Sequence, residues 1–139
     1  MSTFRLEIIT PEKIAFQAPV DYLSVPSKEG VLGILAGHEP LFSLLSEGEL
    51  KISAKGEETF LAIGGGYLEV TRDKVVVLVS NAVKADEINE QEVLNAKKRA
   101  EEALEQKPEG EALIDAQAMF RRSQIALKVL KRRKRVELS

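Results

Sequence analysis

A chain of 139 residues is long enough for one ordinary domain, or for one compact domain with a small appendage. It contains no cysteine and only one histidine, which excludes disulfides, cysteine nucleophiles and cysteine-based metal sites. The formal charge of −2 hides an asymmetry, because residues 85–115 are strongly acidic and residues 116–139 carry eight basic side chains and one acidic side chain. This distribution predicts a charged partner surface, or a fold that brings the two segments together.

The N-terminal residues lack the basic and apolar regions of a signal peptide, so we expect none. The longest apolar runs, such as residues 75–79, are far shorter than the ~20 residues that a membrane-spanning helix needs. We therefore expect a chain that does not cross a membrane.

Residues 1–84 have the pattern of short β-strands. Phe4, Leu6 and Ile8 alternate with Arg5 and Glu7, which is the period of a half-buried strand. Similar segments follow at residues 14–16, 20–25, 50–53, 59–63, 67–71 and 75–80. Turn residues separate them about every 8–12 positions, which favours an antiparallel sandwich or barrel. Residues 75–79 are apolar at every position, so this strand is expected to be buried on both faces.

Two amphipathic helices are predicted after residue 85. In the first, apolar residues recur at intervals of three and four: Val93, Ala96, Ala100, and Ala103 or Leu104. Asp86, Glu87 and Asn89 supply an N-cap and acidic first-turn residues. Pro108 and Gly110 end this helix, and a second helix is predicted over residues 111–135. Its apolar stripe consists of Leu113, Ala116, Phe120, Ser123, Leu127 and Leu130.

The loop between the helices is short, and the first helix presents alanines that permit close approach. An antiparallel hairpin is therefore expected, with the acidic first helix facing the basic second one. Because isolated helices of this length are marginally stable, the hairpin needs another surface to lean on and is expected to move.

Two features resemble catalytic motifs but are better explained structurally. Gly64–Gly66 lacks the spacing of a phosphate-binding loop and precedes a strand, so it predicts a tight turn or a close approach of two backbones. His38 has no accompanying nucleophile and orienting carboxylate, so it is interpreted as a turn or cap residue. No catalytic residue and no metal site is predicted.

The basic segment exceeds what one helix end requires. Its residues are Arg121, Arg122, Lys128, Lys131, Arg132, Arg133, Lys134 and Arg135. A solvated helix end needs one or two cations to complement the helix dipole. Nucleic-acid binding is the alternative, although such sites are usually accompanied by interleaved aromatic residues. A mobile basic helix that docks on an acidic protein surface fits the segment better.

Two stretches of the chain resemble the ε subunits of F-type ATP synthases. They are the run E-G-x-L-G-I-L-x-G-H-x-P-L from Glu29 to Leu41 and the run G-G-x-x-E-V from Gly65 to Val70. The resemblance extends over nearly the whole chain. It implies an α+β, mainly β, fold: an antiparallel β-sandwich of about ten strands over residues 1–85, then a two-helix antiparallel hairpin over residues 86–139.

The resemblance also implies a function. The chain would be a non-catalytic rotor subunit of the central stalk, peripheral to the cytoplasmic face of the cell membrane, that couples ion-driven rotation to ATP synthesis. Its β-domain would contact the γ subunit and the c-ring, through Glu29, Gly30, Val31 and His38. Its hairpin would extend into the α/β catalytic head, where the eight basic residues above would dock on an acidic segment and hinder ATP hydrolysis. Nucleic acid would not be a partner, and no cofactor is expected.

Some members of that family bind ATP through the motif [I/L]-D-x-x-R-A in the first helix. The aligned residues here keep Ile88 but place Asn89, Glu92 and Val93 where the motif has Asp, Arg and Ala. Glu92 would repel phosphate, and Arg99 and Arg122 are the remaining candidate phosphate partners. We predict weak or absent ATP binding.

Overall fold

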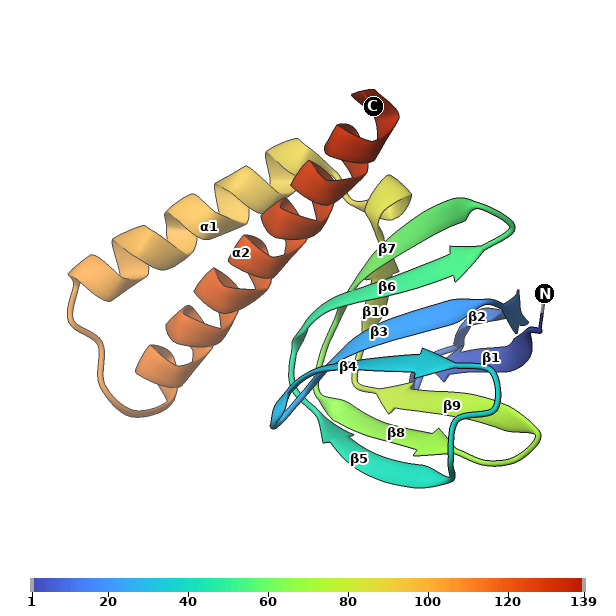
Figure 1. Ribbon diagram of the computed structural model, residues 1–139. Helices are drawn as coiled ribbons and strands as arrows, with labels where there is room; N and C mark the ends of the chain where they lie inside the picture. Colours follow the sequence, from blue (N-terminus) through green and yellow to red (C-terminus); the bar gives the residue numbers. More distant parts are fainter. Residues whose placement is uncertain (1, 139) are drawn as a thin grey trace. The chain divides into compact units, whose positions relative to one another are not determined.

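The computed structural model (Figure 1) describes residues 2–138, so residues 1 and 139 of the predicted domain ranges lie outside the described residues. The strands are β1 (Phe4–Ile9), β2 (Ile14–Val20), β3 (Tyr22–Ser27), β4 (Gly30–Leu35), β5 (Leu41–Leu45), β6 (Gly48–Ala54), β7 (Glu57–Ile63), β8 (Gly66–Val70), β9 (Lys74–Val79) and β10 (Ala82–Lys84). The helices are η1 (Ala85–Glu87), a 3-10 turn, followed by α1 (Glu90–Glu105) and α2 (Gly110–Leu138). The chain divides after Lys84 into two compact units.

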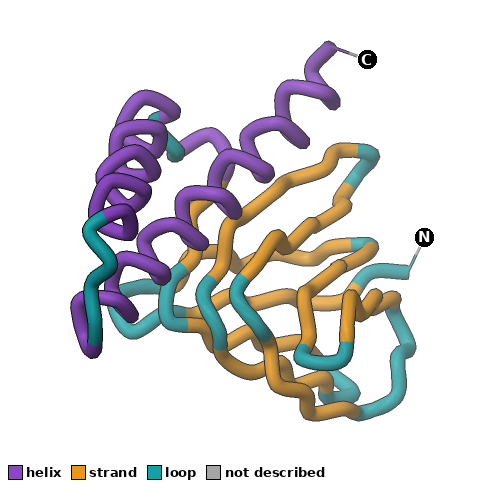
Figure 2. Tube along the Cα trace, turned by 90° about the vertical axis from the view of Figure 1, so that its left-hand side faces the viewer, coloured by secondary structure: helices purple, strands orange, loops and turns teal. Residues whose placement is uncertain are grey.

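The β-unit is a sheet folded into two layers. The strand order is β10-β7-β6-β3-β5-β8-β9-β1-β2, and β4 pairs with β3 outside this path. The β3–β5 ladder consists of the single pair Ser27 and Leu45, so the sheet turns a corner there. Figure 2 shows the strands curving around one another. This confirms the predicted sandwich.

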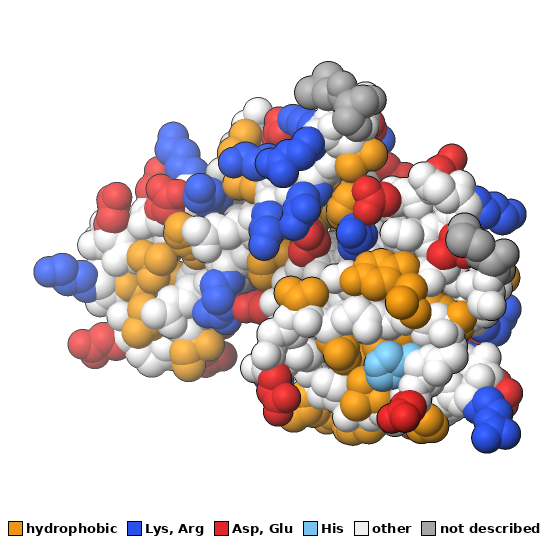
Figure 3. Space-filling model, viewed as in Figure 1, with side chains coloured by type: hydrophobic (Ala, Val, Ile, Leu, Met, Phe, Trp, Pro, Cys, Tyr) orange, Lys and Arg blue, Asp and Glu red, His pale blue; other side chains and the backbone are white. Residues whose placement is uncertain are grey.

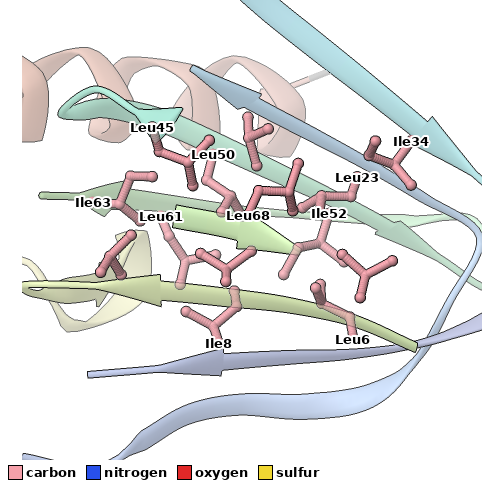
Figure 4. Close-up of a cluster of buried hydrophobic side chains, with 14 of the residues drawn as sticks. Leu6, Ile8, Leu23, Ile34, Leu45, Leu50, Ile52, Leu61, Ile63 and Leu68 are labelled. Atoms are coloured by element: carbon pink, nitrogen blue, oxygen red, sulfur yellow. The ribbon is translucent and has the colours of Figure 1, made fainter. Parts of the chain in front are cut away.

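The core of the β-unit lies between the layers and contains aliphatic side chains. Leu6, Ile8, Leu23, Leu50 and Leu61 have no exposed surface. Figure 4 shows the side chains of this cluster pointing toward one another from different strands. The alternation predicted for residues 4–8 is confirmed, since Leu6 and Ile8 face the core while Arg5 and Glu7 pair outside it. Burial of such side chains is the main term that stabilises the sandwich.

Some predictions from the residue pattern need correction. β4, β5 and β10 were not among the predicted segments, because β4 and β5 contain glycine or serine within short runs and β10 has only three residues. The β1–β9 ladder is parallel, which sequence alternation cannot reveal. The expectation that β9 is buried on both faces was wrong. Val75, Val77 and Val79 are buried, but Leu78 is 46% exposed.

Of the three consecutive glycines, Gly66 marks a close approach of backbones, as predicted. A Cβ atom built on Gly66 would lie 1.9 Å from the carbonyl oxygen of Leu78 and 2.8 Å from the Cα atom of Val79. Gly66 therefore sits where β8 and β9 leave no room for a side chain, and only glycine fits. The site has no phosphate-binding geometry, since β8 and not a helix follows.

A polar cluster on the outer face of β1 predicts a pH-dependent contribution to stability. The Gln17 Nε2 group donates to Glu7 Oε2 at 3.1 Å, Arg5 Nε donates to the same oxygen at 3.2 Å, and Lys74 Nζ lies 3.6 Å from Oε1. These contacts, the Gln17 hydrogen bond first, hold the pKa of the Glu7 carboxyl below its ordinary value of 4.5. Because the folded pKa is lowered, the contribution is present above the unfolded pKa and is lost as pH falls through the folded pKa.

We therefore expect Glu7→Gln to lower the free energy of unfolding at pH 7 slightly, and the difference from the unmodified chain to shrink as the solution is acidified below about pH 4. Urea denaturation over a pH series measures the difference in unfolding free energy at pH 7 and its change with pH. Glu12→Gln, the same substitution at an exposed turn position, is the control. A difference for Glu7→Gln that stays constant down to acid pH would contradict the expectation.

The second unit is the predicted antiparallel helical hairpin, and α1 and α2 lie side by side in Figures 1 and 2. Asn89 is the N-cap of α1, because its Oδ1 atom accepts from Glu92 N at 3.0 Å. In α1, Ala100 is buried and Leu104, rather than Ala103, is the covered residue at the end of the stripe. Every predicted stripe residue of α2 is buried or half-buried, and Val129, which was not predicted, is fully buried.

Ser123 is a polar member of the α2 stripe and is only 5% exposed. Its hydroxyl donates to the carbonyl oxygen of Met119, one turn earlier, at 2.8 Å. This local hydrogen bond satisfies the hydroxyl within its own helix and lets serine occupy an apolar position.

Candidate interaction surfaces

The outer face of β5, β8 and β9 carries an exposed apolar patch, here called the aromatic patch: Phe42, Leu44, Tyr67 and Leu78. Leu44 is directly opposite Tyr67 in the β5–β8 ladder, and Tyr67 is directly opposite Leu78 in the β8–β9 ladder. Residues directly opposite one another share a face, so these three side chains form a row across the strands. Phe42 lies two residues from Leu44 and is therefore on the same face.

The two rings of the aromatic patch support each other. The ring centroids of Phe42 and Tyr67 are 5.5 Å apart with an interplanar angle of 32°. Phe42 is nevertheless 62% exposed and Tyr67 is 47% exposed. Pre-positioned aromatic rings that remain exposed are typical of protein–protein interfaces, where they fill pockets of the partner. The patch can bind another protein through apolar contact.

The four residues predicted to touch the c-ring or γ do not come together. Glu29 lies in the tight turn between β3 and β4, and Gly30 and Val31 begin β4, where Gly30 has a φ of 121° and Val31 is 80% exposed. His38 lies in the turn that follows the other end of β4 (Gly30–Leu35). A strand of this length spans about 17 Å, so the two groups are at opposite ends of β4.

His38 is a turn residue, as predicted. Its backbone N–H donates to the carbonyl oxygen of Leu35 at 3.2 Å. Its Nδ1 atom lies 2.7 Å from the carbonyl oxygen of Glu39, and because a carbonyl only accepts, Nδ1 carries the proton. The turn leads directly into β5, the strand that carries Phe42 and Leu44. His38 is thus next to the aromatic patch in the sequence and far along β4 from Val31.

The predicted basic residues all lie on α2, but they do not share one face. Residues 131–135 are five consecutive cations, and successive helical residues are ~100° apart, so they surround the helix axis. Figure 3 shows blue side chains gathered along the C-terminal half of α2. Arg133 Nε pairs with Glu137 Oε1 one turn later at 2.9 Å. This end of α2 can therefore attract an acidic surface from several directions.

One ion pair ties the start of α1 to the end of α2. Lys134 Nζ lies 2.7 Å from Glu90 Oε2 and 3.2 Å from Oε1. Farther along the hairpin, the ammonium group of Lys97 lies 5.8 Å from the ring centroid of Phe120. Exposed pairs of this kind contribute about 1 kcal/mol or less, so they align the helices without locking them together.

The residues considered for ATP lie at the end of η1 and on α1 and α2. The Asn89 side-chain oxygen is used as the helix cap described above. Arg99 and Arg122 are exposed on α1 and α2, and Glu92 is exposed at the first turn of α1. Ile88 N donates to the Ala85 carbonyl oxygen at 3.2 Å, which places Ile88 at the end of η1. Within residues 2–138 no group of three or more His, Asp or Glu side chains has the arrangement of a metal site.

The aromatic patch was missed by the residue pattern. Phe42, Tyr67 and Leu78 belong to strands in which outward apolar residues look the same as core residues, and only the ladder register shows that they face outward. None of the helices in the described part of the chain is long and apolar enough to span a membrane.

Comparison with known proteins assigns both units to the same class. The family model "ATP synthase, Delta/Epsilon chain, beta-sandwich domain" matches residues 3–85, and the model "ATP synthase, Delta/Epsilon chain, long alpha-helix domain" matches residues 86–131. The sandwich and hairpin thus define a subunit of the ATP synthase delta/epsilon class.

Relatives agree with this class. The chain is 39% identical to an ATP synthase epsilon chain of Dehalococcoides mccartyi over 97% of both chains. It is also 39% identical to an ATP synthase epsilon chain of Herpetosiphon aurantiacus over 94% of this chain and 96% of that one. The chain belongs to the ATP synthase delta/epsilon family and is an epsilon subunit of ATP synthase.

Two solved structures share the fold. One is a chain of the Euglena gracilis mitochondrial ATP synthase (OSCP/F1/c-ring in rotational state 1), with a TM-score of 0.69, 24% identity, and coverage of 98% of this chain and 82% of that chain. The other is a chain of the central stalk and c-ring of the Tetrahymena thermophila mitochondrial ATP synthase, with a TM-score of 0.56, 16% identity, and coverage of 93% and 97%.

Proposed function

We propose that the chain is a non-catalytic rotor subunit in the central stalk of an F-type ATP synthase, at the cytoplasmic face of the cell membrane. Its β-unit joins the γ subunit to the c-ring and so couples ion-driven rotation to ATP synthesis. Its α1–α2 hairpin restrains ATP hydrolysis. The observation that carries the proposal is that one chain of this family bears two separate surfaces: an exposed aromatic patch on the β-unit and a dense basic segment on α2.

The aromatic patch is assigned to the γ subunit, with His38 at its margin. Its support is chemical, because exposed aromatic rings on a rigid sheet provide the strong, long-lived contact that a subunit turning as one body with γ requires. Glu29, Gly30 and Val31, at the β3–β4 turn and the start of β4, are assigned to the c-ring. Val31 is the most exposed of the large apolar side chains among the described residues, and it stands at the opposite end of β4 from His38.

The basic segment of α2 is assigned to an acidic segment of the α/β catalytic head. The residues are Arg121, Arg122, Lys128, Lys131, Arg132, Arg133, Lys134 and Arg135. The ring of cations around the end of α2 steers the helix toward negative charge, and pairs that become desolvated add coupling energy. ATP binding to the hairpin remains predicted as weak or absent, which agrees with the use of Asn89 as a helix cap. Nucleic-acid binding is not favoured, since both units match the delta/epsilon class.

Removing the hairpin tests the regulatory half of the proposal. A chain ending after Ala85 keeps the whole buried cluster of the β-unit, which lies between Leu6 and Ala82. It should still bind γ and the c-ring, and ATP hydrolysis by the reconstituted enzyme should rise several-fold because the basic helix is gone. A steady-state hydrolysis assay on enzyme with the full and the shortened chain measures this.

A second variant separates charge from the physical presence of the helices. Glutamine at the five cations of residues 131–135 in the full chain should reproduce most of the increase in hydrolysis if charge is the cause. Unchanged hydrolysis with the shortened chain, at full incorporation into the enzyme, would end the regulatory assignment while leaving the γ and c-ring assignments standing.

A further inference from the structure

A groove runs between α1 and α2 with a volume of about 540 Å³. Its lining comes from both helices: Glu90, Leu94, Lys97, Gln124, Leu127, Lys128, Leu130, Lys131 and Lys134. Neither Arg99 nor Arg122, the residues considered above for ATP, is part of it. The volume lies in the range of small-molecule sites.

The groove combines an apolar floor with a cationic rim. Leu94, Leu127 and Leu130 form the floor, and Leu94 is 44% exposed. Lys128, Lys131 and Lys134 follow one another along α2 at intervals of three residues, and all three line the groove from the α2 side. The rise along the helix axis from the first to the last is about 9 Å. An isolated phosphate would use the lysines and leave the leucines exposed to water. A ligand that satisfies both needs an apolar body and a negative group.

The cationic rim is only partly neutralised by the chain. Lys134 is paired with Glu90, and Lys97 lies over the ring of Phe120. Among the described residues, no carboxylate lies within ion-pair distance of Lys128 or Lys131, and both side chains are exposed. A ligand anion at the middle of the rim would therefore meet two cations without first displacing an internal partner.

The two ends of the groove favour a compact ligand over a long one. The Glu90–Lys134 ion pair lies at one end, and Gln124 with Lys97 lies at the other. The lining spans about 10 Å along α1 and about 15 Å along α2 at 1.5 Å per residue. A partner helix would have to continue across these polar ends, whereas a medium-length acyl chain fits between them.

We propose that the groove binds a single-chain anionic amphiphile, with its acyl chain on the three leucines and its carboxylate or phosphate head at Lys128 and Lys131. The ligand touches α1 through Leu94 and α2 through the other residues, so it favours the closed hairpin over any form in which the helices separate. Binding does not depend on the proposed function. The effect of binding on the enzyme does rest on the proposed function. The ligand's anionic group covers two cations that are assigned to the α/β catalytic head, so the bound amphiphile weakens the restraint on ATP hydrolysis.

Titration of the full chain with decanoate and with decyl phosphate, at concentrations where neither forms micelles, tests the binding. Calorimetry should show saturable binding, and the methyl NMR signals of Leu94, Leu127 and Leu130 should shift. The double variant Lys128→Gln/Lys131→Gln should weaken binding about tenfold, the effect of losing two exposed ion pairs. Lys98→Gln, which removes an exposed cation of α1 outside the groove, should leave the affinity unchanged.

Further probes distinguish the source and the class of ligand. Decyl maltoside, which has the same chain and no charge, and inorganic phosphate, which has charge and no chain, should each bind at least tenfold more weakly than decyl phosphate. Equal binding of either would overturn the proposal. Binding to anionic phospholipid vesicles alone would also overturn the proposal, because it would identify a membrane as the occupant. A shift of the leucine methyl signals with an acidic amphipathic peptide alone would overturn it too, because it would identify a protein as the occupant.

The hydrolysis assay separates this inference from the function proposed above. If decanoate binds in the groove but ATP hydrolysis by the reconstituted enzyme does not change, the site stands and its regulatory consequence fails. If no amphiphile binds while the shortened chain still raises hydrolysis, the site fails and the proposed function stands.

Discussion

The double variant Phe42→Ala/Tyr67→Ala is expected to lose about 100-fold of its affinity for the γ subunit, or roughly 2.7 kcal/mol. The rings are exposed on a rigid sheet and hold each other in position, so little conformational entropy is lost when a partner covers them. Removing both eliminates the largest apolar area of the aromatic patch. Surface plasmon resonance with immobilised γ measures the change, which should appear mainly in the dissociation rate.

The fold of this variant should persist. Its loss of unfolding free energy is expected to be about 1 kcal/mol or less, because the two rings lie outside the core and lose mainly their mutual contact. Ile14→Ala is the matched control, since Ile14 is 57% exposed on β2 and is not part of the aromatic patch. Equal affinities for γ in the double variant and the control would show that γ binds elsewhere.

The second large effect is expected at Gly66, where Gly66→Ala should lower the free energy of unfolding by about 3 kcal/mol, the upper end of the cost of overpacking. The added methyl group would lie 1.9 Å from the Leu78 carbonyl oxygen and 2.8 Å from its carbonyl carbon. Both atoms belong to the backbone of β9, so no side-chain rotation can relieve the contact. β8 must move away from β9, which strains the ladder hydrogen bonds between them.

Gly65→Ala is a control one residue away. Its new Cβ atom would lie 3.4 Å from the Leu45 carbonyl oxygen, which is an ordinary contact. Its unfolding free energy should therefore stay within about 0.5 kcal/mol of the unmodified chain. Chemical denaturation of both variants checks the pair. Similar stabilities for the two would mean that β8 and β9 yield at Gly66 without cost.

The aromatic patch also explains the incorrect expectation for β9. A run of five apolar residues usually marks a strand buried on both faces. Here Val75, Val77 and Val79 fill the core while Leu78 points outward beside Tyr67. The sequence cannot distinguish an apolar residue that faces a second layer from one that faces outward, because local alternation does not show which face of the strand is covered.

The hairpin was predicted more completely than the sandwich. Intervals of three and four residues depend only on local helical geometry, so Val93, Ala100, Ala116 and Leu130 could be placed on covered faces from the sequence. Val129 was missed because, at ~100° per residue, it lies on the opposite side of α2 from most of the stripe, yet it is fully buried. The strands β4 and β5 have weak local signals and form because β3 and β8 pair with them.

The sequence by itself determined the class of fold, the division into a strand region and a helical pair, and the unequal distribution of charge, because each is set by local period and composition. Only the tertiary structure decided which residues share a surface. It separated Val31 from His38 by the length of β4, aligned Leu44, Tyr67 and Leu78 across three strands, and lined one groove with lysines from both helices. The physical reason is that strand register and helix pairing join residues far apart in the chain, and local propensity contains no information about that joining.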